Sequence, residues 1–110
     1  MSLDLKTLQR LSLQLFRLDP DLTISRILVF ILIARKSDGC LVRELMEATG
    51  LNQSTIARII ALLSDKPQRG EKTGLEWVRM DPDPSDPRRV IVSVTAKGKR
   101  VLSDIEALAN

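Results

Sequence analysis

The sequence has no histidine and no tyrosine, and it has a single cysteine, Cys40. Without histidine the chain lacks the ordinary transition-metal ligand sets and the Ser-His or Cys-His pairs of nucleophilic enzymes. One cysteine also excludes an intramolecular disulfide framework. We therefore expect no catalytic residues, no metal and no cofactor. We interpret Cys40 as a small buried apolar residue rather than a redox switch.

Aromatic residues are few as well: Phe16, Phe30 and Trp77. They are a poor supply of stacking surfaces for single-stranded nucleic acid, so duplex DNA suits the composition better. The longest apolar run covers only the eight residues 27–34, which is too short to cross a membrane. No leader-like segment is recognisable, so we expect a cytoplasmic protein with no membrane partner.

The composition is that of one small globular domain over residues 1–110, with 44% hydrophobic and 28% charged residues. Seventeen Lys and Arg against fourteen Asp and Glu give a formal charge of +3. This mild basic excess is compatible with nucleic-acid binding but does not establish it. A core of this size also favours a partner subunit.

The hydrophobic pattern predicts a mainly α protein with a small β-hairpin, in a winged helix-turn-helix arrangement of about five helices and a two- to three-stranded wing. The second predicted helix is apolar nearly all round, which is typical of a central buried helix. Gly50 supplies the tight turn between the third and fourth helices. The helices are predicted over 2–18, 24–34, 42–49, 53–64 and 96–110.

The fourth predicted helix has one apolar face, formed at i, i+3, i+4 and i+7 by Ile56, Ile59, Ile60 and Leu63. Its opposite face is short, polar and nearly free of acid. A helix in the DNA major groove needs such a face, because long or negative side chains there would meet the phosphate walls. An ordinary solvated helix face is the alternative. The candidate DNA-contacting residues are Gln53, Ser54, Thr55 and Arg58. Arg58 is suited to guanine and Gln53 to adenine.

Two stretches of strand-forming residues, 75–80 and 89–94, predict a hairpin with a proline-stiffened tip. In the second stretch Val90, Val92 and Val94 are expected to point inward.

Arg88 and Arg89 follow the tip of the hairpin, and Asp86 is placed to hold one guanidinium. A wing that lays arginine in the adjacent minor groove gains from the negative potential there. We therefore count all three residues as candidate DNA-binding residues. The alternative is a surface ion pair between Asp86 and Arg88, worth at most about 1 kcal/mol.

Two motifs resemble the MarR (multiple antibiotic resistance regulator) family of winged-helix transcription factors, over roughly residues 23–102. The first is the helix-turn-helix segment 42–61. The second is the wing signature Asp-x-Arg, five residues, Leu-Thr, which here is Asp86, Arg88 and Val94-Thr95, followed by Gly98. The resemblance implies a symmetric homodimer that presents two recognition helices to pseudo-palindromic double-stranded DNA. Such proteins usually repress transcription until a ligand or oxidant distorts them, and we name no effector.

The leucines of the first predicted helix cover an arc wider than a helix normally turns to its own core, which supports the dimer independently. We expect the flanking helices 1–18 and 96–110 to form the interface. The candidate dimerisation residues are Leu5, Leu8, Leu11, Leu15, Leu102, Ile105 and Leu108.

The chain departs from the family pattern in two segments. The region after the wing is short, so we expect a smaller dimer interface. Residues 64–74 form a longer link than usual between recognition helix and wing, and we expect a loop that touches phosphates. The competing hypothesis is a winged helix used as a protein-protein interaction or assembly module without specific DNA binding. The fourth helix favours DNA, because its outward face lacks the aromatic or aliphatic anchors of protein hot spots.

Overall fold

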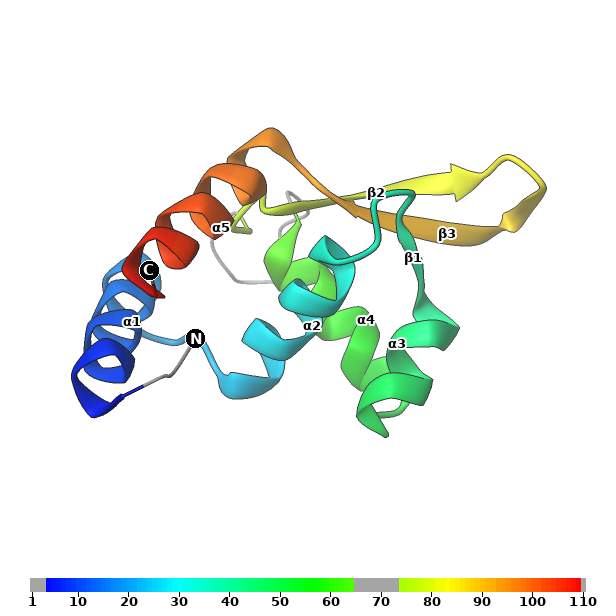
Figure 1. The fold of residues 1–110 in the computed structure, drawn as a ribbon. Coiled ribbons are helices and arrows are strands. Elements are labelled where there is room, and N and C mark those ends of the chain that lie inside the picture. The colour runs from blue at the N-terminus through cyan, green and yellow to red at the C-terminus, as the bar shows by residue number, and fades with distance from the viewer. Residues whose placement is uncertain (1–3, 65–73, 110) are drawn as a thin grey trace.

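The structure, a computed structural model, describes residues 4–64 and 74–109. This part of the chain forms five helices and three strands (Figure 1). The predicted mainly α class with a small β-hairpin is thus confirmed. The elements in chain order are α1 (Leu5–Leu18), α2 (Ile24–Ala34), β1 (Cys40–Leu41), α3 (Val42–Thr49), α4 (Gln53–Leu63), β2 (Val78–Asp83), β3 (Asp86–Val94) and α5 (Ala96–Ala109).

Four of the helices begin at side chains that cap their first turn. Asp4, Thr23, Asn52 and Thr95 each accept a hydrogen bond from the backbone N–H three residues further on, at 2.8, 3.2, 2.9 and 3.0 Å. These bonds satisfy N–H groups that have no partner within the helix. The predicted start of the first helix at residue 2 lies outside the described residues, and the described helix begins at Leu5.

The three strands form one antiparallel sheet in the order β1-β3-β2. The two strands of the hairpin extend closer to its tip than predicted. The first strand, β2, covers Val78–Asp83 instead of 75–80, and β3 begins at Asp86 instead of at residue 89. Each strand contains a proline near the tip, and a proline argues against a strand in a sequence-based prediction. Pro82 is tolerated because β2 is an edge strand with an irregular register beside it. Pro87 is tolerated because it lies beyond the short stretch of β3 that also pairs with β1.

The expected inward set of β3 is correct only in part. Val92 is buried and Val94 is half-buried, but Val90 is 39% exposed. Val90 pairs with Pro82 near the tip, and β1 reaches only to the neighbours Ile91 and Val92. The outer part of the hairpin therefore extends beyond the elements that would cover it, as Figure 1 shows.

The core lies where α2, α3 and α4 meet the sheet. All four predicted inward residues of α4 are buried. The rings of Phe30 and Trp77 lie beside each other, with centroids 4.9 Å apart and planes inclined at 41°. This contact connects α2 to the segment that enters the hairpin and so fixes the base of the wing against the helices.

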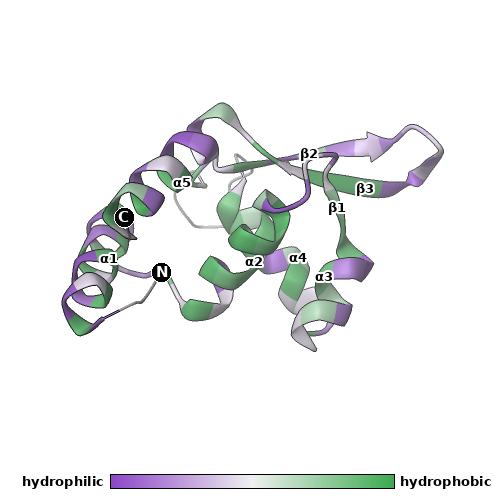
Figure 2. Ribbon diagram, viewed as in Figure 1, coloured by the Kyte–Doolittle hydropathy of each residue, from purple (hydrophilic) through white to green (hydrophobic). Residues whose placement is uncertain are grey.

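The second helix is central on one face only. Val29, Phe30 and Ile33 are buried, whereas Ile24 and two further large apolar residues of α2 stay exposed. The prediction of a helix buried all round is therefore wrong for the outer face. The reason is that α4, α3 and the sheet cover only one side of α2. Figure 2 shows how hydrophobic α2 is along its length.

The helices α1 and α5 pack along each other at one end of the molecule, and the wing extends toward the other end (Figure 1). In residues 4–64 and 74–109 no helix is both long and apolar enough to cross a membrane.

Candidate nucleic-acid interface

The turn between α3 and α4 is built by Gly50 and Asn52. Gly50 has a left-handed backbone with φ of 76° and donates its N–H to the carbonyl of Met46 at 2.8 Å. A residue with a side chain would be strained in this conformation. The Asn52 side chain then caps α4 and also accepts a hydrogen bond from the Ser54 hydroxyl at 2.9 Å. The helix-turn-helix expected from Gly50 is thus present.

The start of α3 is held by Glu44. Its carboxylate accepts a hydrogen bond from the backbone N–H of Leu41 at 2.9 Å and pairs with the Lys36 ammonium at 2.6 Å. The Lys36 hydrogen bond, followed by the Leu41 N–H, holds the pKa of Glu44 below its ordinary value. Both side chains are partly exposed, so the pair positions α3 on the end of α2 more than it stabilises the fold.

The outward face of α4 carries the predicted DNA-contacting residues. Gln53, Ser54 and Arg58 are exposed, and Thr55 is half-buried. The Ser54 hydroxyl and the Thr55 backbone N–H both bond to the capping Asn52, so Ser54 is engaged through its side chain and Thr55 through its backbone only. Arg58 has no hydrogen-bond or ion-pair partner in the part of the chain that the structure describes. Its guanidinium and the Gln53 amide are the groups available to a ligand.

Asp86 holds two arginines of the wing, Arg88 and Arg89, where the sequence predicted that it would hold one. Its carboxylate accepts hydrogen bonds from the Arg88 backbone N–H at 3.1 Å and from Arg88 Nε at 3.2 Å. The second oxygen lies 3.5 Å from Arg89 Nε. The hydrogen bonds from Arg88 are the main reason that the pKa of Asp86 lies below its ordinary value. Arg88 remains 90% exposed and Arg89 51% exposed.

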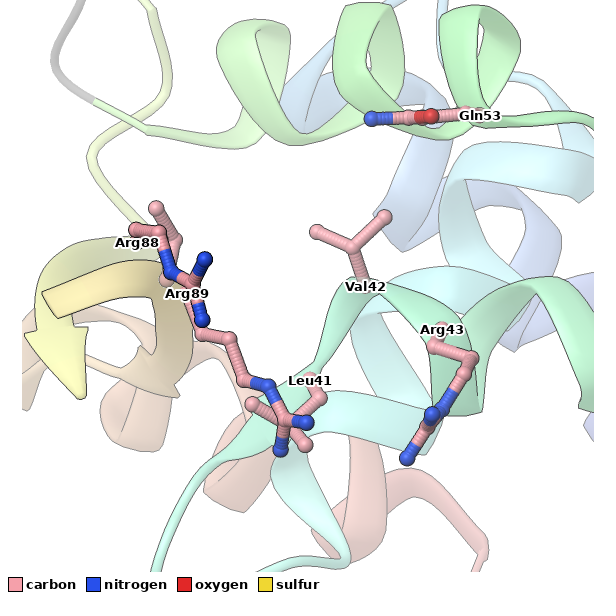
Figure 3. Close-up of a pocket in the computed structure, with 7 residues that line it drawn as sticks. Leu41, Val42, Arg43, Gln53, Arg88 and Arg89 are labelled. Carbon is pink, nitrogen blue, oxygen red and sulfur yellow. The ribbon is translucent and has the colours of Figure 1, made fainter. Parts of the chain in front are cut away.

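A cleft of about 240 Å³ separates the wing from the helix-turn-helix. It brings Gln53 of α4 together with Arg88 and Arg89 of β3, so predicted residues of the helix and of the wing border one surface. Arg43 of α3 also lines it, and no acidic side chain is among the described lining residues. Figure 3 shows this arrangement. The lining residues are Leu41, Val42, Arg43, Gln53, Arg88, Arg89 and Val90.

Arg43 was not among the predicted DNA-contacting residues, although it lines the cleft. Its place in the cleft depends on β1, because β1 joins α3 to the wing by pairing Cys40 with Val92. A two-residue strand has no periodicity to detect. The available signal was a basic side chain at the second position of the predicted helix 42–49. A basic side chain at a helix start does not by itself indicate a binding site.

Cys40 is buried, with 2% of its surface exposed. Burial raises the pKa of its thiol above the ordinary value. A buried, protonated thiol is a weak nucleophile, so the interpretation of Cys40 as a small apolar core residue is confirmed. In the described residues no group of three or more His, Cys, Asp and Glu side chains is placed to hold a metal ion.

The predicted dimerisation residues differ in exposure. Leu5 and Leu8 of α1 are exposed at 84% and 46%. Leu102 and Ile105 of α5 pack against the core of their own chain. The remaining three are half-buried, namely Leu11, Leu15 and Leu108. The predicted loop between α4 and the hairpin, residues 64–74, falls almost entirely outside the described residues.

A helix-turn-helix followed by an antiparallel hairpin that packs on it defines a winged helix-turn-helix protein. Among solved structures, the S. aureus MepR-DNA complex superposes with a TM-score of 0.76 and 14% identity, over 94% of this chain and 75% of that chain. The chain has the MarR-like winged-helix fold, as the resemblance implied.

Two further solved structures share this fold. An E. coli MarR with a cysteine-to-serine mutation, complexed with operator DNA, gives a TM-score of 0.65 and 23% identity over 96% of this chain and 69% of that chain. CouR from Rhodococcus jostii RHA1, bound to p-coumaroyl-CoA, gives 0.68 and 22% over 94% of this chain and 64% of that chain. No protein-family model matches the sequence, and no curated protein matches it.

Proposed function

We propose that this protein is a sequence-specific double-stranded DNA-binding regulator of transcription that acts as a repressor in the cytoplasm. The observation that carries the proposal is the cleft in which α4, α3 and the wing present cationic and amide side chains side by side. Because helix and wing border one face, a single DNA duplex can contact both. Two of the similar structures are DNA complexes, which supports the same ligand.

In this proposal α4 enters the major groove. Arg58 and Gln53 are exposed polar side chains of this helix. An arginine that donates two hydrogen bonds to guanine is the commonest specific contact in that groove. Arg88 extends from the wing with 90% of its side chain exposed, and its length and charge suit an adjacent narrow minor groove.

We further propose a homodimer on a pseudo-palindromic site. In the described residues, all large apolar side chains that remain exposed, except Val90, lie on α1 and α2. Exposed apolar side chains concentrated on two helices favour a protein-protein contact. A second copy of the chain is the simplest partner, because two-fold dimers are the commonest assembly and a two-fold protein matches a two-fold operator. The exposed apolar residues of α1 and α2 are Leu5, Leu8, Leu13, Phe16, Leu18, Ile24, Leu28 and Ile31.

Selection of duplexes from a random pool, followed by affinity measurements across a salt series, tests the proposal. We expect an enriched pseudo-palindrome with half-sites about 10 base pairs apart. Affinity should fall steeply with salt, because each phosphate contact releases counterions. Scrambled DNA should bind more weakly at every salt concentration.

A second candidate function is a protein interaction or assembly module. The exposed apolar residues of α1 and α2 favour it, since they fit any protein surface of matching shape. The same selection separates the two functions. No enriched motif, together with weak binding that hardly changes with salt, would support the interaction module and refute the DNA-binding regulator. CouR was solved with p-coumaroyl-CoA, but we assign no effector to this protein.

A further inference from the structure

We infer that the cleft between wing and helix-turn-helix binds one phosphodiester group of the DNA backbone, held between Arg43 and Arg89. The inference rests on the proposed DNA-binding function and adds to it a binding residue, Arg43, on the first helix of the motif. It also assigns different tasks to the two neighbouring arginines of the wing.

The position of the cleft follows from the shape of the duplex. In B-DNA the major and minor grooves are separated by a sugar-phosphate backbone. If α4 lies in the major groove and the wing in the adjacent minor groove, one backbone must pass between them. The surface between them is the cleft, which has Gln53 of α4 on one side and Arg89 of the wing on the other. A phosphate ridge therefore faces this cleft whenever both elements are in their grooves.

The chemistry of the cleft suits a phosphate. Arg43 is exposed, and in the described residues its guanidinium has neither a hydrogen-bond nor an ion-pair partner. Figure 3 shows the Arg43 and Arg89 side chains extending in the same direction from α3 and from the wing. A guanidinium presents a planar fork of donors that matches phosphate oxygens. Two such groups from two elements can grip one phosphate from both sides.

The remaining walls strengthen this electrostatic attraction. Leu41, Val42 and Val90 form apolar parts of the lining. Apolar walls lower the local dielectric, so a charge pair beside them is stronger than on an open surface. The volume of about 240 Å³ is well above the roughly 30 Å³ that one water molecule takes up in the liquid. The cleft thus has room for a group larger than water.

The two wing arginines are held differently. Arg88 bonds to Asp86 through its backbone N–H and its Nε, and it is 90% exposed. Arg89 is 51% exposed, and its Nε lies 3.5 Å from the same carboxylate. The more enclosed Arg89 therefore serves the phosphate, and Arg88 is left to extend into the minor groove.

The experiment uses the full chain and the operator obtained by selection, with a single neutral methylphosphonate placed at each backbone position in turn. Each duplex is titrated with the unchanged protein, with Arg43→Gln, with Arg89→Gln and with Arg100→Gln. Arg100 is the matched control, because it is an exposed arginine of α5 that is not among the residues lining the cleft. Thermal melting checks that each variant is folded.

We expect Arg43→Gln and Arg89→Gln to weaken binding to operator and to scrambled DNA by similar factors. Each should lower the slope of log affinity against log salt by up to about 0.9, the value for one phosphate contact. At one methylphosphonate position in each half-site, both substitutions should lose most of their effect on affinity. The neutral methylphosphonate has already removed the negative charge that the two arginines would contact. Arg100→Gln should behave like the unchanged protein at every position.

Three results would overturn the inference. Arg43→Gln behaving like Arg100→Gln would remove Arg43 from the interface. Loss of the two effects at different backbone positions would show two separate phosphates rather than one. In both cases the unchanged protein still binds its operator, so the proposed function stands. Failure of the unchanged protein to bind any duplex would refute the proposed function itself, and the inference with it.

Discussion

The Thr95 hydroxyl donates a hydrogen bond to the backbone carbonyl of Glu76 at 2.6 Å and accepts one from the backbone N–H of Gly98 at 3.0 Å. One side chain thus connects three segments: the entry to the hairpin, the end of β3 and the first turn of α5. Glu76 has a positive φ of 64°, which is uncommon for a residue with a side chain. The Thr95 bond helps to hold the backbone in this conformation.

Replacing Thr95 by valine removes both hydrogen bonds and keeps the shape of the side chain. We expect the free energy of unfolding to fall by about 1–2 kcal/mol, the range for loss of a helix cap and a neutral hydrogen bond. Urea unfolding followed by circular dichroism measures this loss. Thr95→Ser keeps the hydroxyl and should retain most of the stability. A Thr95→Val variant as stable as the unchanged protein, with a loss only in Thr95→Ser, would show that the methyl group, not the hydroxyl, matters.

Gly98 leaves no room for a side chain, because a Cβ there would overlap the backbone carbonyl oxygen of Trp77. In an exposed helix, glycine to alanine usually stabilises by up to about 1 kcal/mol. For Gly98→Ala we expect the opposite sign, a destabilisation of about 1–3 kcal/mol, as for other overpacked sites. Ser103→Ala on the exposed side of α5 is the control and should be nearly neutral. A Gly98→Ala variant as stable as the control would contradict the close contact.

Arg58→Ala should weaken binding to the selected operator far more than binding to scrambled DNA. The physical reason is that a guanidinium paired with a base edge contributes about 1–3 kcal/mol of discrimination, whereas a phosphate contact contributes equally on every sequence. Competition titrations with both duplexes measure the ratio. Equal weakening on both would show that Arg58 only contacts phosphate.

Asp86→Asn should lower the ratio of specific to non-specific binding. The substitution leaves Arg88 and Arg89 without the carboxylate that orients them, and it removes one negative charge, which raises affinity for any DNA. Asp104→Asn on α5 makes the same charge change far from the wing, so it controls for net charge. If both variants raise affinity for all DNA equally, Asp86 has no orienting role.

The pH dependence of DNA binding follows from the Asp86 carboxylate. Its arginine partners lower the pKa of Asp86 below the ordinary value, so the pairing is complete at neutral pH. It is lost only in acid, as the pH falls through this lowered pKa. The chain has no histidine. At constant ionic strength we therefore expect a DNA affinity that is nearly flat between about pH 5.5 and 8. A steep change within this range would point to a titrating group in the interface.

Leu8→Asp should separate the homodimer without unfolding the monomer. Leu8 is 46% exposed. A carboxylate at this position is therefore solvated in the monomer, but in the dimer it would be buried without a partner in an apolar interface. Sedimentation at micromolar concentration should show a dimer for the unchanged protein and a folded monomer for the variant. Sedimentation of the unchanged protein as a monomer would refute the dimer.

Local patterns predicted much of this protein, and long-range contacts account for what they missed. The face of α4 followed from the spacing of its isoleucines because helical periodicity is local. The strand β1 and the place of Arg43 depend on pairing with β3, far along the chain. The outer face of α2 was misjudged because core and subunit interfaces are both apolar. The wing signature indicated Thr95 and Gly98, but the contacts of Gly98 with Trp77 appear only in three dimensions.

The short strand β1 has a mechanical consequence. It pairs with β3 and leads without a linker into α3. Tilting the base of the wing against the helix-turn-helix would break the backbone bonds of that ladder, so we expect the two to move together. In a dimer, a signal that weakens DNA binding would then act by changing the spacing or angle between two such bodies. The hinge for that motion would lie toward α1 and α5, away from the proposed DNA-binding surface.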